Sequence, residues 1–137
     1  MTAFNLTILA SDKPFFNGKC ESVILPTSHG EYGVLAHHRN MIAAITTGML
    51  KYRPENDEMH IASVSDGIIK IEKGDVLVLV DTIERPEEID ANRAQLEIDK
   101  ANEALLQKRT RAEYEASRAR LARAINRLKA KNYRISD

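Results

Sequence analysis

The sequence predicts an α+β protein, with an N-terminal antiparallel β-sandwich followed by a C-terminal antiparallel two-helix hairpin. Three observations predict this class. All six glycines and all four prolines lie at or before Pro86, so the last 51 residues contain no backbone breaker. Before residue 84 apolar residues alternate with polar ones in short segments, and after it they recur at helical spacing. We therefore expect one domain at 1–84 and another at 85–137.

The first domain is predicted to consist of short strands. Phe4, Leu6 and Ile8 alternate with polar neighbours, which is the period of a strand with one buried face. Further strands are expected at Lys19–Leu25, Gly33–Leu35, Met41–Thr46, Met49–Arg53, Met59–Val64, Ile68–Glu72 and Val76–Thr82. Turn signals such as Asp12–Pro14, Asn17–Gly18 and Ser65–Gly67 separate them. Many closely spaced strands predict a sandwich or a flattened barrel.

A first helix is expected from about residue 87 to 107. Pro86 suits the first helical position because its missing N–H would have no helical partner there, and carboxylates after it suit the positive end of the helix dipole. A narrow apolar stripe follows along one helical face, formed by Ala94, Ile98, Ala101 and Leu105. Such a stripe predicts a partner helix.

A second helix, expected at about 111–132, can be that partner. Thr110 with Glu113 three residues later fits a capping box. Its apolar stripe is expected from Tyr114, Leu121, Ile125 and Leu128, and its many alanines allow close helix approach. A hairpin with so little apolar bulk should be able to detach from its surroundings.

Composition excludes few function classes. Basic and acidic residues both number 20, so net charge gives no reason to expect nucleic acid as a partner. Charge is nevertheless uneven, because 108–137 carries ten basic and three acidic residues. The single Cys20 forms no internal disulfide, and the longest apolar run, Val76–Val80, is too short to span a bilayer. The cytosol is the default compartment, and we expect any membrane association to run through a partner.

The chain offers little that resembles a catalytic or metal site. His29, His37, His38, His60 and Cys20 lack the spacing of metal ligands. Neither Ser63, Ser65 nor Cys20 has a base and an orienting acid at recognisable spacing, and no glycine-rich phosphate loop is present. The sequence therefore does not favour an enzyme.

The helical region is a better candidate for ligand binding. Asp90, Arg93 and Ala94 share one helical face, and Arg123 and Arg127 share a face of the second helix. In a folded hairpin these arginines would return near residues 89–94, where a polyanion could be clamped. The alternative is that Asp90 and Arg93 form a local salt bridge and the second-helix arginines form a solvated surface.

Several segments together resemble the epsilon subunit of the F-type ATP synthase. They are Val23–Leu25, the run Gly30-Glu31-Tyr32-Gly33-Val34-Leu35-Ala36-His37-His38, the turn Ser65–Ile68 and the motif Ile89-Asp90-Ala91-Asn92-Arg93-Ala94. The order of a sandwich and two helices is also that of this family. The resemblance implies a non-catalytic part of the rotary central stalk, which couples proton flow to ATP synthesis at the cytoplasmic side of the cell membrane.

The resemblance also implies the partners. In the family the sandwich docks on the gamma subunit and on the ring of c subunits, and Glu31 and His38 match positions in that contact region. Members commonly have Leu-Pro-Gly-His-x-Pro here, whereas this chain has Leu35 to Asn40 without either proline or the glycine. The conformation of this loop is therefore expected to differ from the usual one.

The family's helices imply a regulatory role. Folded against the sandwich they are inactive, and extended into the catalytic head of alpha and beta subunits they inhibit ATP hydrolysis. In some bacterial members ATP, a regulatory ligand rather than a required cofactor, binds the folded form. The matching residues are Glu84, Ile89, Asp90, Arg93, Ala94, Arg123 and Arg127. The alternatives are a purely structural role of this motif and a stand-alone ATP-sensing module.

Overall fold

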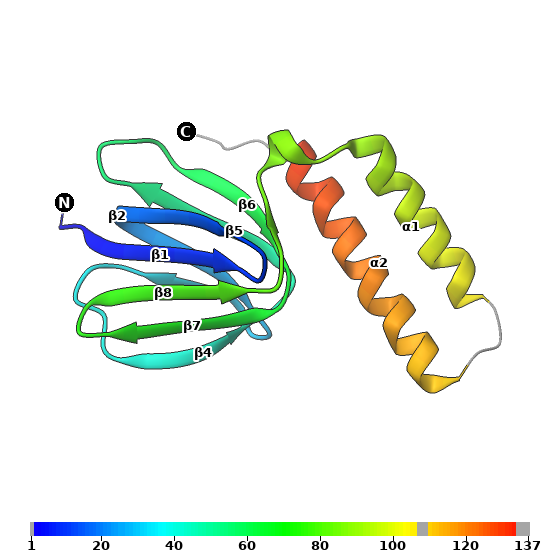
Figure 1. Ribbon diagram of the computed structural model, residues 1–137, viewed down its shortest axis with the longest axis horizontal. Coiled ribbons are helices and arrows are strands. Elements are labelled where there is room, and N and C mark those ends of the chain that lie inside the picture. Colours follow the sequence, from blue (N-terminus) through cyan, green and yellow to red (C-terminus); the bar gives the residue numbers. More distant parts are fainter. Residues whose placement is uncertain (1, 107–109, 134–137) are drawn as a thin grey trace. The chain divides into compact units, whose positions relative to one another are not determined.

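The computed structural model describes residues 2–106 and 110–133. It divides the chain into two compact units, Met1–Glu84 and Arg85–Asp137. The first unit is built of strands and the second of helices (Figure 1). The predicted fold class, a sandwich followed by a helical hairpin, is confirmed.

Nine strands form the first unit. They are β1 (Phe4–Ala10), β2 (Pro14–Thr27), β3 (Gly30–Val34), β4 (Met41–Ile45), β5 (Gly48–Pro54), β6 (His60–Val64), β7 (Gly67–Glu72), β8 (Asp75–Val80) and β9 (Ile83–Glu84). Each predicted strand is present. The short β9 was not predicted, and it pairs antiparallel with the end of β6.

All strands belong to one continuous sheet that folds over a single core. The order is β4-β7-β8-β1-β2-β5-β6-β9, with β3 pairing β2 beside this path. The long β2 pairs with β1 along its first half and with β3 and β5 along its second half. One pair, β1 with β8, is parallel, so the antiparallel prediction holds for every strand pair of the described residues except this one.

The core is formed by the inward faces of these strands. Phe4, Leu6 and Ile8 of β1 are buried, as their alternation predicted. The other fully buried large side chains include Leu25, Leu50, Ile69 and Ile71, and all members of this core cluster belong to the first unit. Because burying one such side chain contributes about 1.5–3 kcal/mol, the sandwich is held mainly by apolar burial.

The predicted turn at Asn17–Gly18 is wrong, since β2 continues through it. Gly18 pairs with Leu6 of β1. A Cβ atom at Gly18 would lie 3.2 Å from Cζ of Phe16, so the glycine makes room for that ring within a strand. A glycine in a strand interior commonly marks such a close approach, whereas Asn-Gly in isolation favours a turn.

The Ser65–Gly67 turn joins β6 to β7 and is present as predicted. The Ser65 hydroxyl accepts hydrogen bonds from the backbone N–H of Thr82 at 2.8 Å and from its hydroxyl at 3.0 Å. A Cβ atom at Gly67 would collide with the carbonyl oxygen of Leu79. Glycine at residue 67 is therefore required by the close approach of β8.

The helical unit comprises a 3₁₀ turn η1 (Pro86–Glu88) and two helices, α1 (Ala91–Leu105) and α2 (Arg111–Asn132). The first helix therefore begins later than the predicted residue 87, because Ile89 and Asp90 are extended. The Asp90 carboxylate caps α1, and this cap decides where the helix starts. The predicted end at residue 107 lies outside the described residues.

Most of the buried side chains of α1 and α2 are small. The buried residues there are Ala94, Ala101, Ser117, Ala124, Asn126 and Ala130. Ile98 and Leu105 are only half-buried, and Tyr114, expected on the apolar stripe of α2, is 44 % exposed. Alanine and serine side chains are short, so helices that bury them can approach closely.

Candidate functional site

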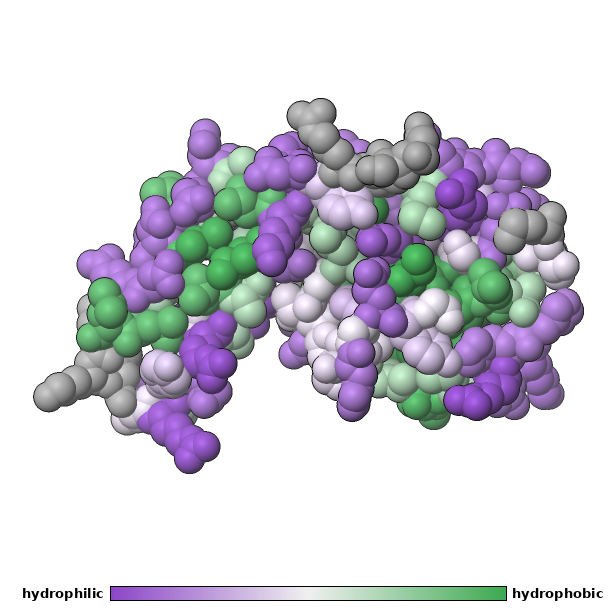
Figure 2. Space-filling view, turned by 180° about the vertical axis from the view of Figure 1, so that it is seen from behind, coloured by the Kyte–Doolittle hydropathy of each residue, from purple (hydrophilic) through white to green (hydrophobic). Residues whose placement is uncertain are grey.

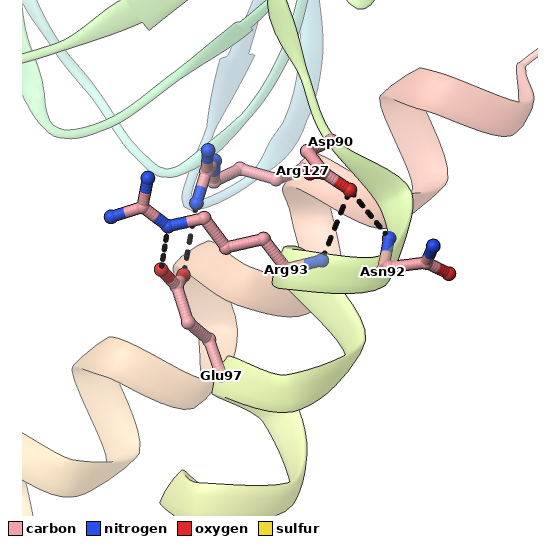
Figure 3. Close-up of polar contacts among 5 residues, drawn as sticks. All are labelled: Asp90, Asn92, Arg93, Glu97 and Arg127. Atoms are coloured by element: carbon pink, nitrogen blue, oxygen red, sulfur yellow. Dashed lines mark hydrogen bonds and ion pairs between the residues drawn. The ribbon is translucent and has the colours of Figure 1, made fainter.

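The candidate site lies where α1 begins, beside the last turns of α2 (Figure 3). Oδ1 of Asp90 accepts hydrogen bonds from the backbone N–H groups of Asn92 at 2.9 Å and Arg93 at 3.2 Å. This is an N-cap, which satisfies N–H groups that have no partner within the helix. The cap fixes the orientation of the first turn, from which the Arg93 side chain extends.

Two guanidinium groups from different helices meet at one carboxylate. Oε2 of Glu97 lies 2.9 Å from Nη1 of Arg127, and its Oε1 lies 3.7 Å from Nε of Arg93 (Figure 3). Arg93 and Glu97 are four residues apart on α1 and share a face. Arg127 reaches the same carboxylate from α2, so this contact links the two helices.

Burial differs among these three side chains. Arg127 is 21 % exposed, Glu97 41 % and Arg93 75 %. Next to them Ala94 is fully buried and Ile89 is 2 % exposed. The two guanidinium groups are therefore partly exposed to solvent, whereas Ala94 and Ile89 beside them are buried. Such a pair of guanidiniums suits a carboxylate or a phosphate group.

The structure brings some of the predicted ligand residues together. Ile89, Asp90, Arg93, Ala94 and Arg127 lie around the start of α1 in the second unit. Arg123 is also on α2 and is exposed.

Glu84 belongs to β9 of the first unit, where it pairs in register with Ser63.

The alternative of a salt bridge between Asp90 and Arg93 is not what the structure shows. Asp90 accepts a hydrogen bond from the backbone N–H of Arg93, and the guanidinium of Arg93 contacts Glu97 instead.

Sequence reasoning missed Glu97. Its spacing of four from Arg93 was a usable signal, because such pairs face each other on a helix. Its contact with Arg127 depends on the register of the two helices, which no local pattern reveals. Another hydrogen bond joins α2 to the turn η1: Nζ of Lys131 donates to the carbonyl oxygen of Pro86 at 3.1 Å.

The two predicted interface residues lie in and after β3. Glu31 is exposed and forms an ion pair with Nζ of Lys51 at 3.3 Å. The imidazole of His38 is held at both nitrogens: the carbonyl of Arg39 accepts from Nδ1 at 2.8 Å, and Nε2 pairs with the Tyr32 hydroxyl at 2.8 Å. The imidazole of His38 is thus anchored to β3.

The loop between β3 and β4 keeps the backbone geometry of a glycine without having one. His37 stands where the family pattern has glycine, and its φ is +64°. This left-handed conformation is unfavourable for a residue with a side chain. The difference in sequence therefore leaves a strained residue immediately before His38.

The remaining reactive groups do not assemble into a site. Burial raises the pKa of the Cys20 thiol to about 12, which leaves it protonated at neutral pH and a poor nucleophile. Within residues 2–106 and 110–133, no three His, Cys, Asp or Glu side chains come together as metal ligands would. Neither α1 nor α2 has the length and apolar character needed to cross a membrane.

Comparison with known proteins gives the family. Residues 3–86 match the family described as "ATP synthase, Delta/Epsilon chain, beta-sandwich domain". The ATP synthase epsilon chain of Ruminiclostridium cellulolyticum is 42 % identical over 134 residues, which cover 98 % of this chain and 99 % of that one. The chain belongs to the ATP synthase epsilon chain family. The epsilon chain of Caldicellulosiruptor bescii, 36 % identical, covers 94 % of this chain and 93 % of its own length.

Solved structures share the fold of this epsilon chain. A chain in the structure of Euglena gracilis mitochondrial ATP synthase, described as OSCP/F1/c-ring, has a TM-score of 0.83 at 21 % identity and covers 97 % of this chain and 83 % of that one. A chain of the Tetrahymena thermophila mitochondrial enzyme, described as central stalk/c-ring, has a TM-score of 0.68 at 16 % identity, covering 93 % and 95 %. Both similarities extend through the sandwich and the helices.

Proposed function

We propose that this epsilon chain is a non-catalytic central-stalk subunit of a proton-translocating ATP synthase, and that its helical hairpin restrains ATP hydrolysis. The sandwich binds the gamma subunit and the ring of c subunits. The hairpin binds ATP when folded and, when released, engages the catalytic head of alpha and beta subunits. The protein is then peripheral on the cytoplasmic side of the cell membrane, held there by its partners.

The meeting of Arg93 and Arg127 across two helices carries the proposal for ATP. Each guanidinium already contacts the carboxylate of Glu97 through one nitrogen. A phosphate is also an anion with several acceptor oxygens, so it can be bound by the same two groups. A ligand that needs both arginines binds only while α1 and α2 are paired. By linkage it must then shift the population toward the folded hairpin.

The surface of the hairpin supports a second partner for the released helices. Leu96 is 58 % exposed and Leu106 is 87 % exposed, and Figure 2 shows apolar side chains along the hairpin between hydrophilic ones. The region 108–137 has ten basic residues. Apolar side chains beside an excess of positive charge suit a protein surface that is acidic and partly apolar.

The contact region around Glu31 and His38 supports docking of the sandwich. Both residues are held by neighbours of the same unit, so they present a prearranged surface. A prearranged surface loses little conformational entropy on binding. We expect Glu31→Ala or His38→Ala to weaken binding to isolated gamma subunit, whereas replacement of the exposed His29 should not.

Isothermal titration calorimetry tests the ATP site. Wild-type protein should bind ATP, and Arg93→Ala and Arg127→Ala should bind it at least ten-fold more weakly, since each loses a charge-assisted contact of about 1.5–3 kcal/mol. Arg118→Ala, which removes an exposed arginine of α2 outside the motif, is the matched control. Equal heats for wild type and Arg93→Ala would refute the pocket.

Deletion of residues 88–137 tests the regulatory role. The reconstituted synthase with the truncated subunit should assemble and should hydrolyse ATP faster than the complete enzyme, with synthesis retained. Unchanged hydrolysis would remove the inhibitory role and leave the docking role.

Affinity purification followed by mass spectrometry tests whether the chain belongs to an ATP synthase complex, because a stand-alone ATP sensor would be recovered without other synthase subunits.

A further inference from the structure

The two arginines of the candidate site hold an anion that the chain itself supplies. The Glu97 carboxylate uses one oxygen for Arg127 and the other for Arg93. These are the same two guanidiniums that a phosphate group would need. Glu97 and a bound phosphate therefore compete for one position.

We propose that Glu97 is a built-in competitor for the polyphosphate of the ligand, occupying the Arg93–Arg127 position in the free hairpin and leaving it when the ligand binds. This inference rests on the proposed ATP site and specifies how that site is regulated. In the free protein the Glu97 carboxylate joins α1 to α2 through Arg127. In the bound protein the ligand joins the two helices by contacting both arginines.

The burial of the three side chains fits such an exchange. Arg127, the least exposed at 21 %, needs an anionic partner in either state, because a charge removed from water is costly when unpaired. Glu97 is 41 % exposed, so its carboxylate can turn into solvent, where water replaces the ion pair. Arg93 is 75 % exposed, so most of its side chain is in solvent and can follow a ligand.

Electrostatics favours the exchange. A triphosphate carries several negative charges, and a carboxylate retained beside it would repel it at close range. Glu97 therefore has to move away for the phosphates to contact both guanidiniums. Its presence lowers the apparent affinity for the ligand and so raises the ligand concentration at which the hairpin becomes saturated.

Glu97→Gln tests the proposal, because glutamine keeps the size of the side chain and removes its charge. By calorimetry, Glu97→Gln should bind ATP about five-fold more tightly than wild type, which is equivalent to about 1 kcal/mol. The reason is that glutamine neither forms the competing ion pair nor repels the phosphates. The control is Glu103→Gln, which changes net charge equally from an exposed residue six positions further along α1. Inorganic tripolyphosphate, titrated in parallel, separates recognition of phosphate from recognition of the nucleoside.

A measurement on the wild type covers the case in which Glu97→Gln loosens the hairpin. Glutamate labelled with ¹³C at the carboxyl carbon reports each side chain by NMR. On saturation with ATP the Glu97 resonance should move toward that of a solvated carboxylate, while the Glu103 resonance stays in place. A Glu97 resonance that does not move at saturation would overturn the proposal.

The calorimetric outcomes separate this inference from the proposed function. If wild type binds ATP and Glu97→Gln binds it no more tightly than Glu103→Gln, the competitor role fails and the ATP site stands. If ATP binds to none of the variants but tripolyphosphate binds more tightly to Glu97→Gln, the competition stands and the ATP site fails. If neither ligand binds to any variant, both fail.

Discussion

The thiol of Cys20 lies fully buried in β2, opposite Phe4, and its environment decides its chemistry. Desolvation raises its pKa from about 9 to about 12, so in the native state it stays protonated where an unfolded chain would ionise. The unfolded state then binds fewer protons between these two values. Stability is therefore unaffected by this group below about pH 9 and falls as pH rises from there toward 12.

A comparison with Cys20→Ala isolates this effect. Between about pH 8 and about pH 10.5 the free energy of unfolding of wild type should fall by about 2 kcal/mol more than that of the variant. Urea denaturation at both pH values measures this. Because the change with pH is taken within each protein, the destabilisation caused by the cavity that alanine leaves cancels. Parallel pH dependence of the two proteins would contradict the burial argument.

His37 provides a second prediction at the level of one residue. Its φ of +64° lies in the left-handed region, and its side chain is exposed, so glycine should relieve strain without loss of packing. We expect His37→Gly to raise the free energy of unfolding by about 1 kcal/mol. The same replacement at His29, which is not among the residues with positive φ, should lower it. Thermal denaturation of both variants is the measurement.

At this scale the sequence predicted which segments come near one another but not the side chain that joins them. Spacing predicted that Arg127 would come near the start of the first helix, and Arg93 and Arg127 both contact Glu97. That they bind a ligand stays a prediction. The contact of Glu97 with Arg127 could not be predicted, because a contact between two helices depends on their register. Small interface residues restrict that register only weakly, so no local pattern encodes it.

Among the elements, α1 shows how a single cap can outweigh other start signals. Asp90→Ala removes the acceptor for two backbone N–H groups and should lower the stability of the helical unit by about 1 kcal/mol. Asp90→Ser keeps a capping oxygen and removes the charge, so it should retain most of that stability. Helix content followed by circular dichroism on heating distinguishes the two. Equal losses in both variants would mean that charge, and not capping, stabilises this end.

Two differences at element boundaries have local causes that the sequence did not reveal. Pro86 was a valid helix start, but it begins the separate turn η1 because Ile89 and Asp90 are extended. Asn17–Gly18 was a valid turn signal, but the ring of Phe16 needs the space beside Gly18 within β2. In both cases a tertiary or capping interaction overrides a residue preference.

At the scale of the whole molecule, the core of the first unit contains, among the residues that the structure describes, none beyond Ile83. A fragment of residues 1–86 should therefore fold alone and unfold in one cooperative transition, because it keeps every buried side chain of that core. Thermal denaturation followed by circular dichroism in the strand region tests this. A fragment without a cooperative transition would show that the helical unit is needed for folding of the sandwich.

The architecture as a whole was predictable because two periodicities divide the chain. Alternation with a period of two before residue 84 and helical spacing after it separate strands from helices. Strand order was not predictable, and neither was the parallel pair of β1 and β8. That pair joins segments about 70 residues apart, and pairing over such a distance depends on the whole core and not on any local pattern.

The length of β2 has a mechanical consequence. Its 14 residues bond to β1 at one end and to β3 and β5 at the other, so a covalent backbone joins the two halves of the sheet. A sideways load on one half is carried to the other along peptide bonds, which do not slip as a packed surface does. The first unit should therefore resist twisting.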